Sequence, residues 1–493
     1  MSQFYTATDH FSILPALLLA LFGCAILLFD FWLFPTPPQR KGLLVFVVLG
    51  EAFAGSGLWR QQAWLSANGA GQLLGFHGAV TIDGFGIFFN WIFLVAALIV
   101  AVVSYKYLEI AGEHHGEYYG LILFAQSGMY FLATGTDLVT LFMGLELMAL
   151  SFYVMVGFLR AEKRSNEAAL KYLLLGAFST GFLAYGFSVM YGLAGSTKLA
   201  DVAAAIALRP AWDPVVFLAL ATTSVGLLFK ISAVPFHMWA PDAYEGAPTT
   251  VTAYLSVASK AASMAFLLRI FTGPLAPARE AWEPLLAVVA VATLTLGNLA
   301  AINQTNIKRL LAYSSISHAG YMLLGLIAGN QTGINGIAVY VMVYTFMNLG
   351  AFLVVVALRR GNIIGDDLED INGLMHKSPG YAVLMLIFLL SLAGIPPTAG
   401  FLGKYYIFLS LIQTGHYALA VIATLYVAVA IYYYFKIVRA MFVRESAEPA
   451  PLATSAGLRM ALGLSGLATL AIGVYPEPFL RFVGQASGLF FLR

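Results

Sequence analysis

The chain has 493 residues, of which 60% are hydrophobic and only 10% are charged, whereas soluble domains carry about 25% charged residues. This composition excludes an ordinary soluble protein, and a formal net charge of +2 gives no basic footprint for nucleic acid. The single cysteine, Cys24, excludes internal disulfides, cysteine-ligated iron–sulfur clusters and CxxC redox chemistry.

Fourteen apolar segments are expected to form helices that cross about 30 Å of hydrocarbon. They lie near residues 11–34, 42–59, 84–105, 117–135, 137–159, 167–193, 214–235, 248–268, 282–303, 310–329, 332–358, 379–412, 417–435 and 460–475. The first is too long for a cleavable signal, and PTPPQRK (Pro35–Lys41) follows it as a stop. Period-2 alternation occurs only weakly, around Val80–Phe89, so a β-barrel is not expected, although a short hairpin could form there. The expected fold class is an all-α polytopic membrane protein of about 14 transmembrane helices.

Two proline-containing stretches are expected to interrupt helices. Pro235 lies in FKISAVPFHMW, and Pro396 and Pro397 lie in SLAGIPPTAGFLGKYY, 161 residues further on. Interrupted helices at corresponding places in two halves indicate an inverted-repeat transporter, although prolines that merely kink long helices remain an alternative. The expected organisation is a three-helix N-terminal segment (1–116), two inverted five-helix repeats (117–281 and 282–445), and a C-terminal helix and tail (446–493).

Basic residues in the connections predict the orientation, because cytoplasmic loops carry an excess of them. One set of alternate connections carries 15 of them, namely Arg40, Lys41, Lys106, Arg160, Lys163, Arg164, Lys308, Arg309, Arg359, Arg360, Lys377, Lys436, Arg439, Arg444 and Arg459. The opposite set carries 7, namely Arg60, Lys198, Arg209, Arg269, Arg279, Arg481 and Arg493. The first set should face the cytoplasm, which places both termini on the outer, periplasmic side of the cell inner membrane.

Four lysines fall inside apolar segments: Lys171, Lys230, Lys260 and Lys404. Each costs about 2.5–3.5 kcal/mol at mid-membrane on insertion scales. Snorkelling from a helix end, or pairing for structure alone, remains an alternative for any single lysine. Lysine suits a proton relay better than arginine, because a desolvated lysine can release its proton near neutral pH while arginine stays charged.

Acidic residues and histidines complete the candidate set. Glu146, in LFMGLELMALSFY, is the expected counter-charge of a buried lysine. Glu51 could have a structural role only, and Asp137 lies at a helix start, where it is expected to cap. His318, in YSSISHAGY, is flanked by hydroxyl side chains and could relay protons or simply be hydrogen-bonded in the core. His237 is a candidate relay beside the first break. The sequence shows no metal site and no nucleotide-binding motif.

Two long stretches resemble a known family. KISAVPFHMWAPDAYEGAPTTVTAYLSVASK (Lys230–Lys260) and NIKRLLAYSSISHAGYMLLG (Asn306–Gly325) are similar to signature segments of the antiporter-like membrane subunits of respiratory complex I, which are related to Mrp-type cation/proton antiporters. The resemblance covers essentially the whole chain and implies 14 helices with two inverted five-helix repeats, each containing a broken helix. Lys404, where M-type subunits carry glutamate, and the lack of a long C-terminal lateral helix favour the N-type, which corresponds to mitochondrial subunit two.

The resemblance also implies a site. The implied proton relay comprises Glu146, Lys171, Lys230, Lys260, His318 and Lys404. Glu146 and Lys230 would form a coupling pair, Lys260 and His318 would lie on a central polar axis, and Lys404 would lie at the far channel. No cofactor is implied in this chain, whereas quinone, NADH, FMN and iron–sulfur clusters would belong to other subunits. The implied partners are M-type and K-type neighbours, the lateral helix of an L-type subunit and membrane lipid, with no nucleic acid.

The expected function is therefore proton translocation coupled to quinone reduction elsewhere in an NADH:quinone oxidoreductase, by a subunit of a translocase that has no redox centre of its own. Two alternatives remain: an Mrp-type Na⁺/H⁺ antiporter subunit, and a structural membrane-arm subunit without its own proton channel. GDDLEDINGLMHKSP (Gly365–Pro379) is expected to be a solvated cytoplasmic connection, with docking of a partner helix as the alternative.

Overall fold

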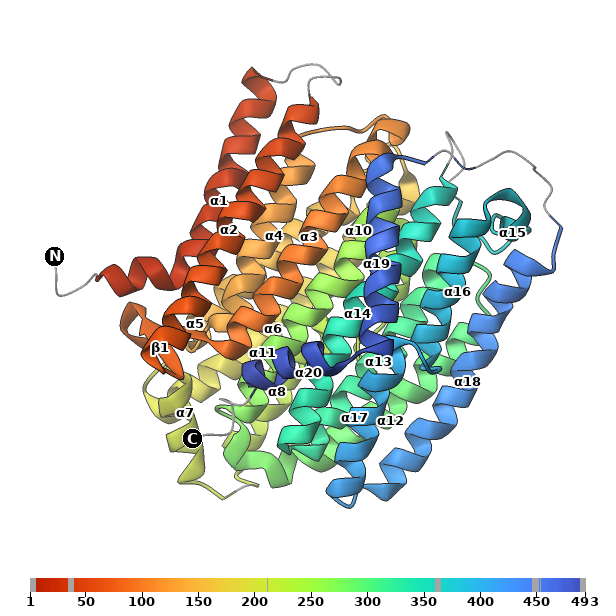
Figure 1. The fold of residues 1–493 in the computed structure, drawn as a ribbon. Coiled ribbons are helices and arrows are strands. Elements are labelled where there is room, and N and C mark those ends of the chain that lie inside the picture. Colours follow the sequence, from red (N-terminus) through yellow and green to blue (C-terminus); the bar gives the residue numbers. More distant parts are fainter. Residues whose placement is uncertain are drawn as a thin grey trace.

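Long helices run side by side through the whole molecule in the computed structural model (Figure 1). The structure describes residues 6–33, 40–210, 212–359, 365–445, 452 and 454–487. Arg360, Arg493 and most of PTPPQRK lie outside the described residues. Every apolar segment expected from the sequence overlaps a helix, so the all-α fold class is confirmed.

The helices have the length and composition of a multi-pass membrane protein. Eleven of the described helices are long and apolar enough to cross a membrane, and two more, α8 (Pro214–Lys230) and α16 (Pro379–Ala393), are shorter and apolar. Large apolar side chains such as Leu28, Phe178 and Leu425 are more than 60% exposed on the outer flanks. Such a surface is suited to hydrocarbon or to an apolar partner rather than to water. The total of 14 membrane crossings remains a prediction.

Three helices and a hairpin form the N-terminal segment. They are α1 (Ala7–Trp32), α2 (Lys41–Asn68), β1 (Gln72–Gly75), the 3₁₀ turn η2 (Phe76–Gly78), β2 (Val80–Asp83) and α3 (Gly84–Ala111). The strands β1 and β2 pair antiparallel, with Gln72 opposite Asp83 and Gly75 opposite Val80. The short hairpin allowed by the sequence therefore exists between the second and third helices.

The first predicted repeat contains five longer helical pieces and four short ones. They are α4 (Glu117–Thr134), α5 (Leu138–Val156), α6 (Lys163–Ala194), α7 (Leu199–Ala207), α8, α9 (Trp239–Gly246), α10 (Thr249–Tyr254), a π-helical turn η3 (Leu255–Ser259) and α11 (Lys260–Thr272). Asp137 caps α5 as expected, since its Oδ1 accepts hydrogen bonds from the backbone N–H groups of Val139 and Thr140. Because α10, η3 and α11 are continuous, they form one buried helix with a wider turn in its middle.

After the 3₁₀ turn η4 (Ala276–Ala278), the second predicted repeat and the C-terminal part follow the same order of long helices. They are α12 (Arg279–Ile302), α13 (Ile307–Ala328), α14 (Gln331–Leu358), α15 (Leu374–Lys377), α16, α17 (Ala399–Gln413), α18 (Tyr417–Phe442), α19 (Ala456–Val474) and α20 (Glu477–Ser487). Each half thus has three helices, then a broken helix, then a further helix, as the predicted repeats require. The domain boundaries themselves remain a prediction.

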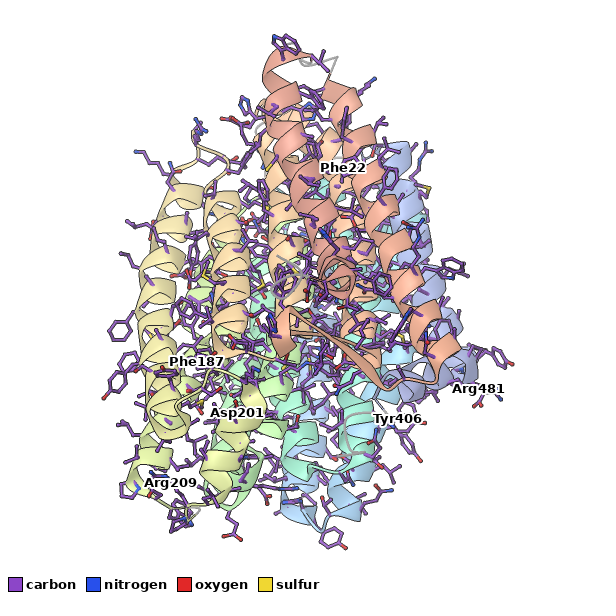
Figure 2. All side chains as sticks on the ribbon, turned by 90° about the vertical axis from the view of Figure 1, so that its left-hand side faces the viewer. Phe22, Phe187, Asp201, Arg209, Tyr406 and Arg481 are labelled. Atoms are coloured by element: carbon purple, nitrogen blue, oxygen red, sulfur yellow. The ribbon has the colours of Figure 1, made fainter. Side chains whose placement is uncertain are left out.

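The connections fall at opposite ends of the bundle. The short helix α15, in a connection predicted to be cytoplasmic, lies at the upper end in Figure 1, and α7 lies at the lower end. Arg209, in the set of connections predicted to face outward, lies at the lower end in Figure 2. The end that holds α15 is called the inner face below.

Two basic residues that were predicted to lie in connections lie within helices and are buried. Arg269, near the end of α11, forms an ion pair of 2.8 Å with Asp83 and donates a hydrogen bond of 2.7 Å to the Ala133 carbonyl oxygen. Lys308, near the start of α13, is 2% exposed. Their placement in loops was therefore wrong, because partners that are distant in sequence allow each charge to be buried.

The connection Gly365–Pro379 is packed on one side and exposed on the other. Leu368, Ile371 and Leu374 are buried, and the Asp366 side chain is buried as well, whereas Asp367, Glu369 and His376 are exposed. Desolvation, together with the neighbouring carboxylates of Asp366 and Asp370, raises the pKa of Asp367. The expectation of a solvated connection therefore holds for the exposed side chains and is wrong for the apolar ones, which cover the inner end of the second half.

Candidate functional site

The first helix break creates an irregular backbone inside the bundle. Helix α8 ends at Lys230, five residues before Pro235, and α9 begins at Trp239. The freed backbone groups have partners, since Val234 N–H donates to the Thr293 hydroxyl (3.0 Å) and Trp239 Nε1–H donates to the Phe229 carbonyl (2.8 Å). These bonds allow a non-helical segment at membrane depth, where unpaired backbone groups are costly.

Lys230 is the last residue of α8, and its ammonium group is enclosed by aromatic rings. It is 3% exposed, and its Nζ lies 3.5 Å from the Tyr153 hydroxyl. Nζ also lies 5.5 Å from the Tyr153 ring centre and 6.0 Å from that of Tyr172. These cation–π contacts offset part of the cost of burying the charged amine.

Glu146 lies near Lys230 but does not touch it. Among the described residues, no ion pair joins the two, although the carboxylate is close enough to interact with the lysine charge. The Glu146 Oε1 atom is buried and has no hydrogen-bond partner in the described part of the chain. The predicted coupling pair is therefore separated in this structure, and Tyr153 is the polar group that lies closest to the ammonium.

Lys260 begins α11, directly after the π-helical turn η3. Its Nζ donates hydrogen bonds to the carbonyl oxygen and the hydroxyl oxygen of Ser315, at 2.7 and 2.5 Å. Single π-helical turns inside helices are often found at functional sites, because they redirect the side chains that follow. Here the turn precedes a fully buried lysine on a helix whose neighbours are also buried.

His318 lies on α13 between two tyrosines from different helices. Its Nδ1 lies 2.5 Å from the Tyr340 hydroxyl of α14, and its Nε2 lies 3.1 Å from the Tyr434 hydroxyl of α18. Tyr434 is in turn hydrogen-bonded to the Ser314 hydroxyl. Both ring nitrogens thus have hydroxyl partners, and a hydroxyl can donate and accept, which is the arrangement that proton relay requires.

The second helix break holds Lys404. Helix α16 ends at Ala393, and Lys404, from the second half-helix α17, donates hydrogen bonds to the carbonyls of Leu392 (3.1 Å) and Ala393 (2.8 Å). Its Nζ also lies 5.0 Å from the ring centre of Tyr321. The ammonium therefore occupies the carbonyl end of a half-helix, where a positive charge is stabilised.

Two glycines shape this second break. Gly394 has a left-handed φ of 84° and lies against Lys404, because a Cβ there would come within 2.8 Å of the lysine Cδ. A Cβ on Gly400 would lie 1.7 Å from the Ser391 carbonyl oxygen. The two half-helices can approach this closely only because both positions lack a side chain.

The contacts arrange the predicted relay residues in two groups. In the first, Glu146 faces Lys230 and its tyrosines. In the second, His318 lies within electrostatic reach of both Lys260 and Lys404. Among the described side chains, no direct hydrogen bond or ion pair links Lys230 to Lys260.

Lys171 does not lie with the buried residues Lys230, Lys260, His318 and Lys404, which are called the row below. Its side chain is 46% exposed and forms ion pairs with Glu167 (2.7 Å) and Asp242 (3.0 Å). Its predicted burial was wrong, because α6 extends beyond the apolar part of its sequence and carries Lys171 at the inner face. There it belongs to a set of charged residues around a surface pocket: Arg164, Glu167, Lys171, Asp242, Glu245 and Arg309, called the inner-face cluster below.

Two other candidates lie away from the row. His237, in the first break, is half-buried, and its Nδ1 has no hydrogen-bond partner in the described part of the chain. Glu51, on α2, is 2% exposed and accepts a hydrogen bond of 3.0 Å from Gln126. The sequence reasoning missed Tyr153, Tyr340 and Tyr434, although tyrosines inside apolar helices signal a polar interior.

Comparisons with known proteins agree on one family. The family described as "NADH:quinone oxidoreductase/Mrp antiporter, TM" matches residues 135–430. The "NADH-quinone oxidoreductase subunit N 2" of Solibacter usitatus is 82% identical over 97% of this chain and 98% of its own length.

Solved structures show the same fold. A chain of respiratory complex I from Thermus thermophilus with bound aureothin is 33% identical, with a TM-score of 0.79 and coverage of 95% of this chain and 98% of its own length. A chain of the Mrp complex from Dietzia sp. superposes with a TM-score of 0.83 over 97% of this chain and 98% of its own length, at 22% identity, which indicates a shared fold.

Proposed function

The chain belongs to the membrane-subunit family that NADH:quinone oxidoreductases share with Mrp antiporters, and it groups with the N subunits of NADH-quinone oxidoreductase; from this premise we propose that it carries protons across the membrane along Lys230, Lys260, His318 and Lys404. The proton motion is driven by quinone reduction elsewhere in the complex. The chain itself contributes side chains that hold and move protons.

One observation carries this proposal. Along α13, His318 lies between Ser315, which binds Lys260, and Tyr321, whose ring centre lies 5.0 Å from Lys404 Nζ. Both ring nitrogens of His318 contact hydroxyl groups. All three groups are fully enclosed in the bundle. Burial of three titratable groups in one place lowers the stability of the fold, so stability does not explain their presence. Such groups are characteristic of proton paths through membranes.

The chemistry of each step is a proton transfer between neighbouring groups. Lys260 holds a proton on Nζ, where Ser315 accepts its hydrogen bonds. On release, the proton passes by hydroxyl groups to one ring nitrogen of His318, while the opposite nitrogen gives up its own proton toward Lys404. Lys404 then holds a proton against the carbonyl end of α16 and releases it to the outer side.

The Glu146–Lys230 pair couples proton transfer in this chain to quinone reduction. When the carboxylate approaches, it favours the ammonium form of Lys230, and when it recedes, burial favours the neutral amine. The separation of the two groups in this structure corresponds to the second condition. Conformational change at the quinone site would shift this pair and so gate the row.

The location and partners follow from the same proposal. We place the chain in the cell inner membrane with both termini on the outer side, as the distribution of basic residues favours. Its neighbours are other membrane-arm subunits, an M-type and a K-type subunit and the lateral helix of an L-type subunit. The exposed apolar flanks on α5, α6 and α18 provide surface for these subunits and for lipid.

Replacement of Lys404 by methionine tests the proposal. Methionine fills a similar volume but cannot hold a proton, so proton transfer through this chain should fall on the order of 10²-fold or more, as it does when a general acid or base is removed. The number of protons moved per NADH oxidised, measured in membrane vesicles that contain the whole complex, should decrease. The matched control is Tyr405→Phe, because Tyr405 is the next residue and is 47% exposed on the outer flank. An unchanged ratio in the Lys404→Met complex would remove Lys404 from the path.

A further inference from the structure

A second buried ion pair lies near the inner face and has no part in the row described above. Lys308 is 2% exposed and Asp366 is 3% exposed. Lys308 Nζ lies 4.0 Å from Asp366 Oδ2 and donates a hydrogen bond of 2.7 Å to the Ala247 carbonyl oxygen. Burial of a lysine and a carboxylate together is costly, and it is retained only where their contacts offset the lost hydration.

The backbone fixes Asp366 over Lys308. Ile307 N–H donates to the Asp366 carbonyl (2.6 Å), and Leu368 N–H donates to the Thr305 carbonyl (2.9 Å). These bonds attach the connection after α14 to the first turn of α13. The carboxylate therefore comes from a segment that is distant in sequence but is held rigidly against the helix that carries Lys308.

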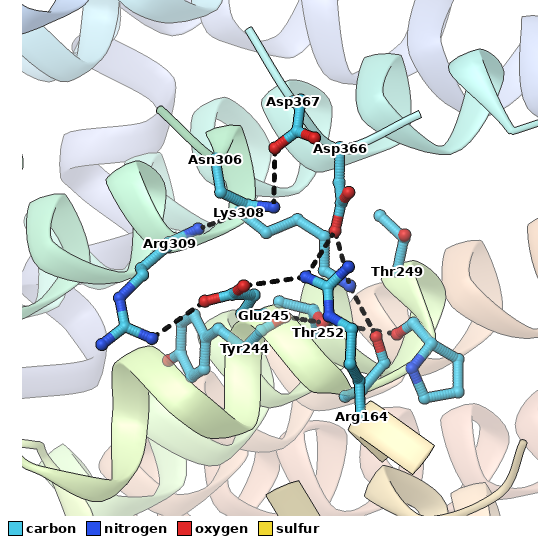
Figure 3. A network of polar contacts seen from close by, with 12 residues as sticks. Arg164, Tyr244, Glu245, Thr249, Thr252, Asn306, Lys308, Arg309, Asp366 and Asp367 are labelled. Atoms are coloured by element: carbon cyan, nitrogen blue, oxygen red, sulfur yellow. Dashed lines mark hydrogen bonds and ion pairs between the residues drawn. The ribbon is translucent and has the colours of Figure 1, made fainter. Parts of the chain in front are cut away.

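Arg164, a member of the inner-face cluster, joins this pair to the cluster. It is 45% exposed and reaches Asp366 at 3.4 Å and Glu245 at 2.8 Å. Figure 3 shows Arg164, Glu245, Lys308 and Asp366 converging at this place. The pair therefore lies directly beside charged side chains that are exposed at the inner face.

Helix α13 leads from this pair toward Lys260, away from the inner face. Ser315, which binds Lys260, lies seven residues after Lys308 on α13, so both share one face of the helix about 10 Å apart. The Tyr244 hydroxyl, from α9, lies beside the Ser315 hydroxyl. Ala247, directly after α9, provides the carbonyl that binds Lys308. Basic and hydroxyl groups thus follow one another from the inner face to Lys260.

We propose that the Lys308–Asp366 pair is the proton inlet of Lys260, which loads it from the inner face without passage through Lys230. This inference rests on the proposed function and alters only its first step, since Lys260 takes its proton from the inner face rather than from Lys230. The ammonium of Lys308 releases a proton to the Tyr244–Ser315 hydroxyls, and the neutral amine of Lys260 accepts one from Ser315. Asp366 takes up a proton from the inner face and passes it to the neutral amine that Lys308 has become, which restores the ion pair. The hydroxyls, Lys308 and Asp366 thus return to their first states, and Lys260 ends with the one proton that entered.

Two variants of Lys308 separate proton transfer from structure. Lys308→Arg keeps a positive charge and N–H donors for Asp366 and the Ala247 carbonyl, but an arginine does not release its proton. Lys308→Met removes both. The inlet predicts that the two variants lose the same share of the proton-to-NADH ratio, and that this share equals the loss in Lys260→Met, all measured on the whole complex in membrane vesicles. The control is Lys436→Arg, because Lys436 also donates to backbone carbonyls, of Ile302 and Gln304, near the same end of α12.

The outcomes distinguish this inference from the proposed function. A Lys308→Arg complex that pumps like the wild type, while Lys260→Met does not, would overturn the inlet and leave the row standing. If Lys260→Met also pumped like the wild type, the proposed function itself would fail. Should the arginine prevent assembly, Asp366→Asn provides the second test, since it keeps Lys308 and removes only the carboxylate that loads it. Unchanged pumping in Asp366→Asn would equally overturn the inlet.

Discussion

Replacement of Lys260 by methionine is expected to stop proton transfer through this chain while the bundle stays folded. The lysine is fully buried, and its only described hydrogen-bond partner is Ser315, through the carbonyl and the hydroxyl. Methionine has a similar shape, so the packing of α11 against α13 should persist. Because the row then lacks a proton carrier in its middle, transfer should fall on the order of 10²-fold or more.

The measurement is the rate of acidification of inverted membrane vesicles during NADH oxidation, with the assembled complex quantified in the same membranes. Ser263→Ala is the matched control, because Ser263 is buried one turn further along α11 and donates only to the Ser259 carbonyl. Acidification per NADH in Lys260→Met equal to that of the control would show that protons do not pass Lys260.

Replacement of Glu146 by glutamine should have the second largest effect. The side chain keeps its size but loses the charge that faces Lys230. The ammonium form of Lys230 then has no carboxylate to stabilise it in a buried aromatic environment. Lys230 should therefore remain neutral through the cycle, and proton movement should become uncoupled from quinone reduction. We expect NADH oxidation to continue while the proton-to-NADH ratio falls.

Tyr153→Phe distinguishes charge from hydrogen bonding at the same place. Tyr153 lies seven residues after Glu146 on α5, and its hydroxyl lies 3.5 Å from Lys230 Nζ, which is a long contact. Loss of this hydroxyl should cost only a few-fold in the rate of acidification, because so long a contact contributes roughly 1 kcal/mol. If Tyr153→Phe were as damaging as Glu146→Gln, the carboxylate charge would not be the controlling element.

Much of the fold could be predicted from the sequence, because the hydrocarbon core selects long apolar segments regardless of tertiary contacts. Each predicted segment overlaps a helix, and the two proline stretches coincide with interruptions between half-helices. The short helices α7, α15 and α20 could not be predicted in this way. They do not cross a membrane, so their position depends on packing against neighbouring elements.

The site was predicted less completely than the fold. Lys230, Lys260 and Lys404 are buried, as their apolar surroundings indicate. Lys171 is not, and Glu167, four residues before it, was the signal of an exposed helical ion pair. Lys308 was missed for the opposite reason. Its segment has the composition of a loop, and its partner Asp366 lies 58 residues away, so local patterns give no indication of the pair.

The central claim is that Lys260 and Lys404 lie on one path, and the proton-to-NADH ratio of the Lys260→Met, Lys404→Met double variant tests it most directly. If both lysines lie on one path, the first substitution already stops the protons that the second would stop, so the two losses should not add. We therefore expect the double variant to pump as much as either single variant and less than the wild type. A further fall in the double variant, equal to the sum of the two single losses, or wild-type pumping in all three, would contradict it.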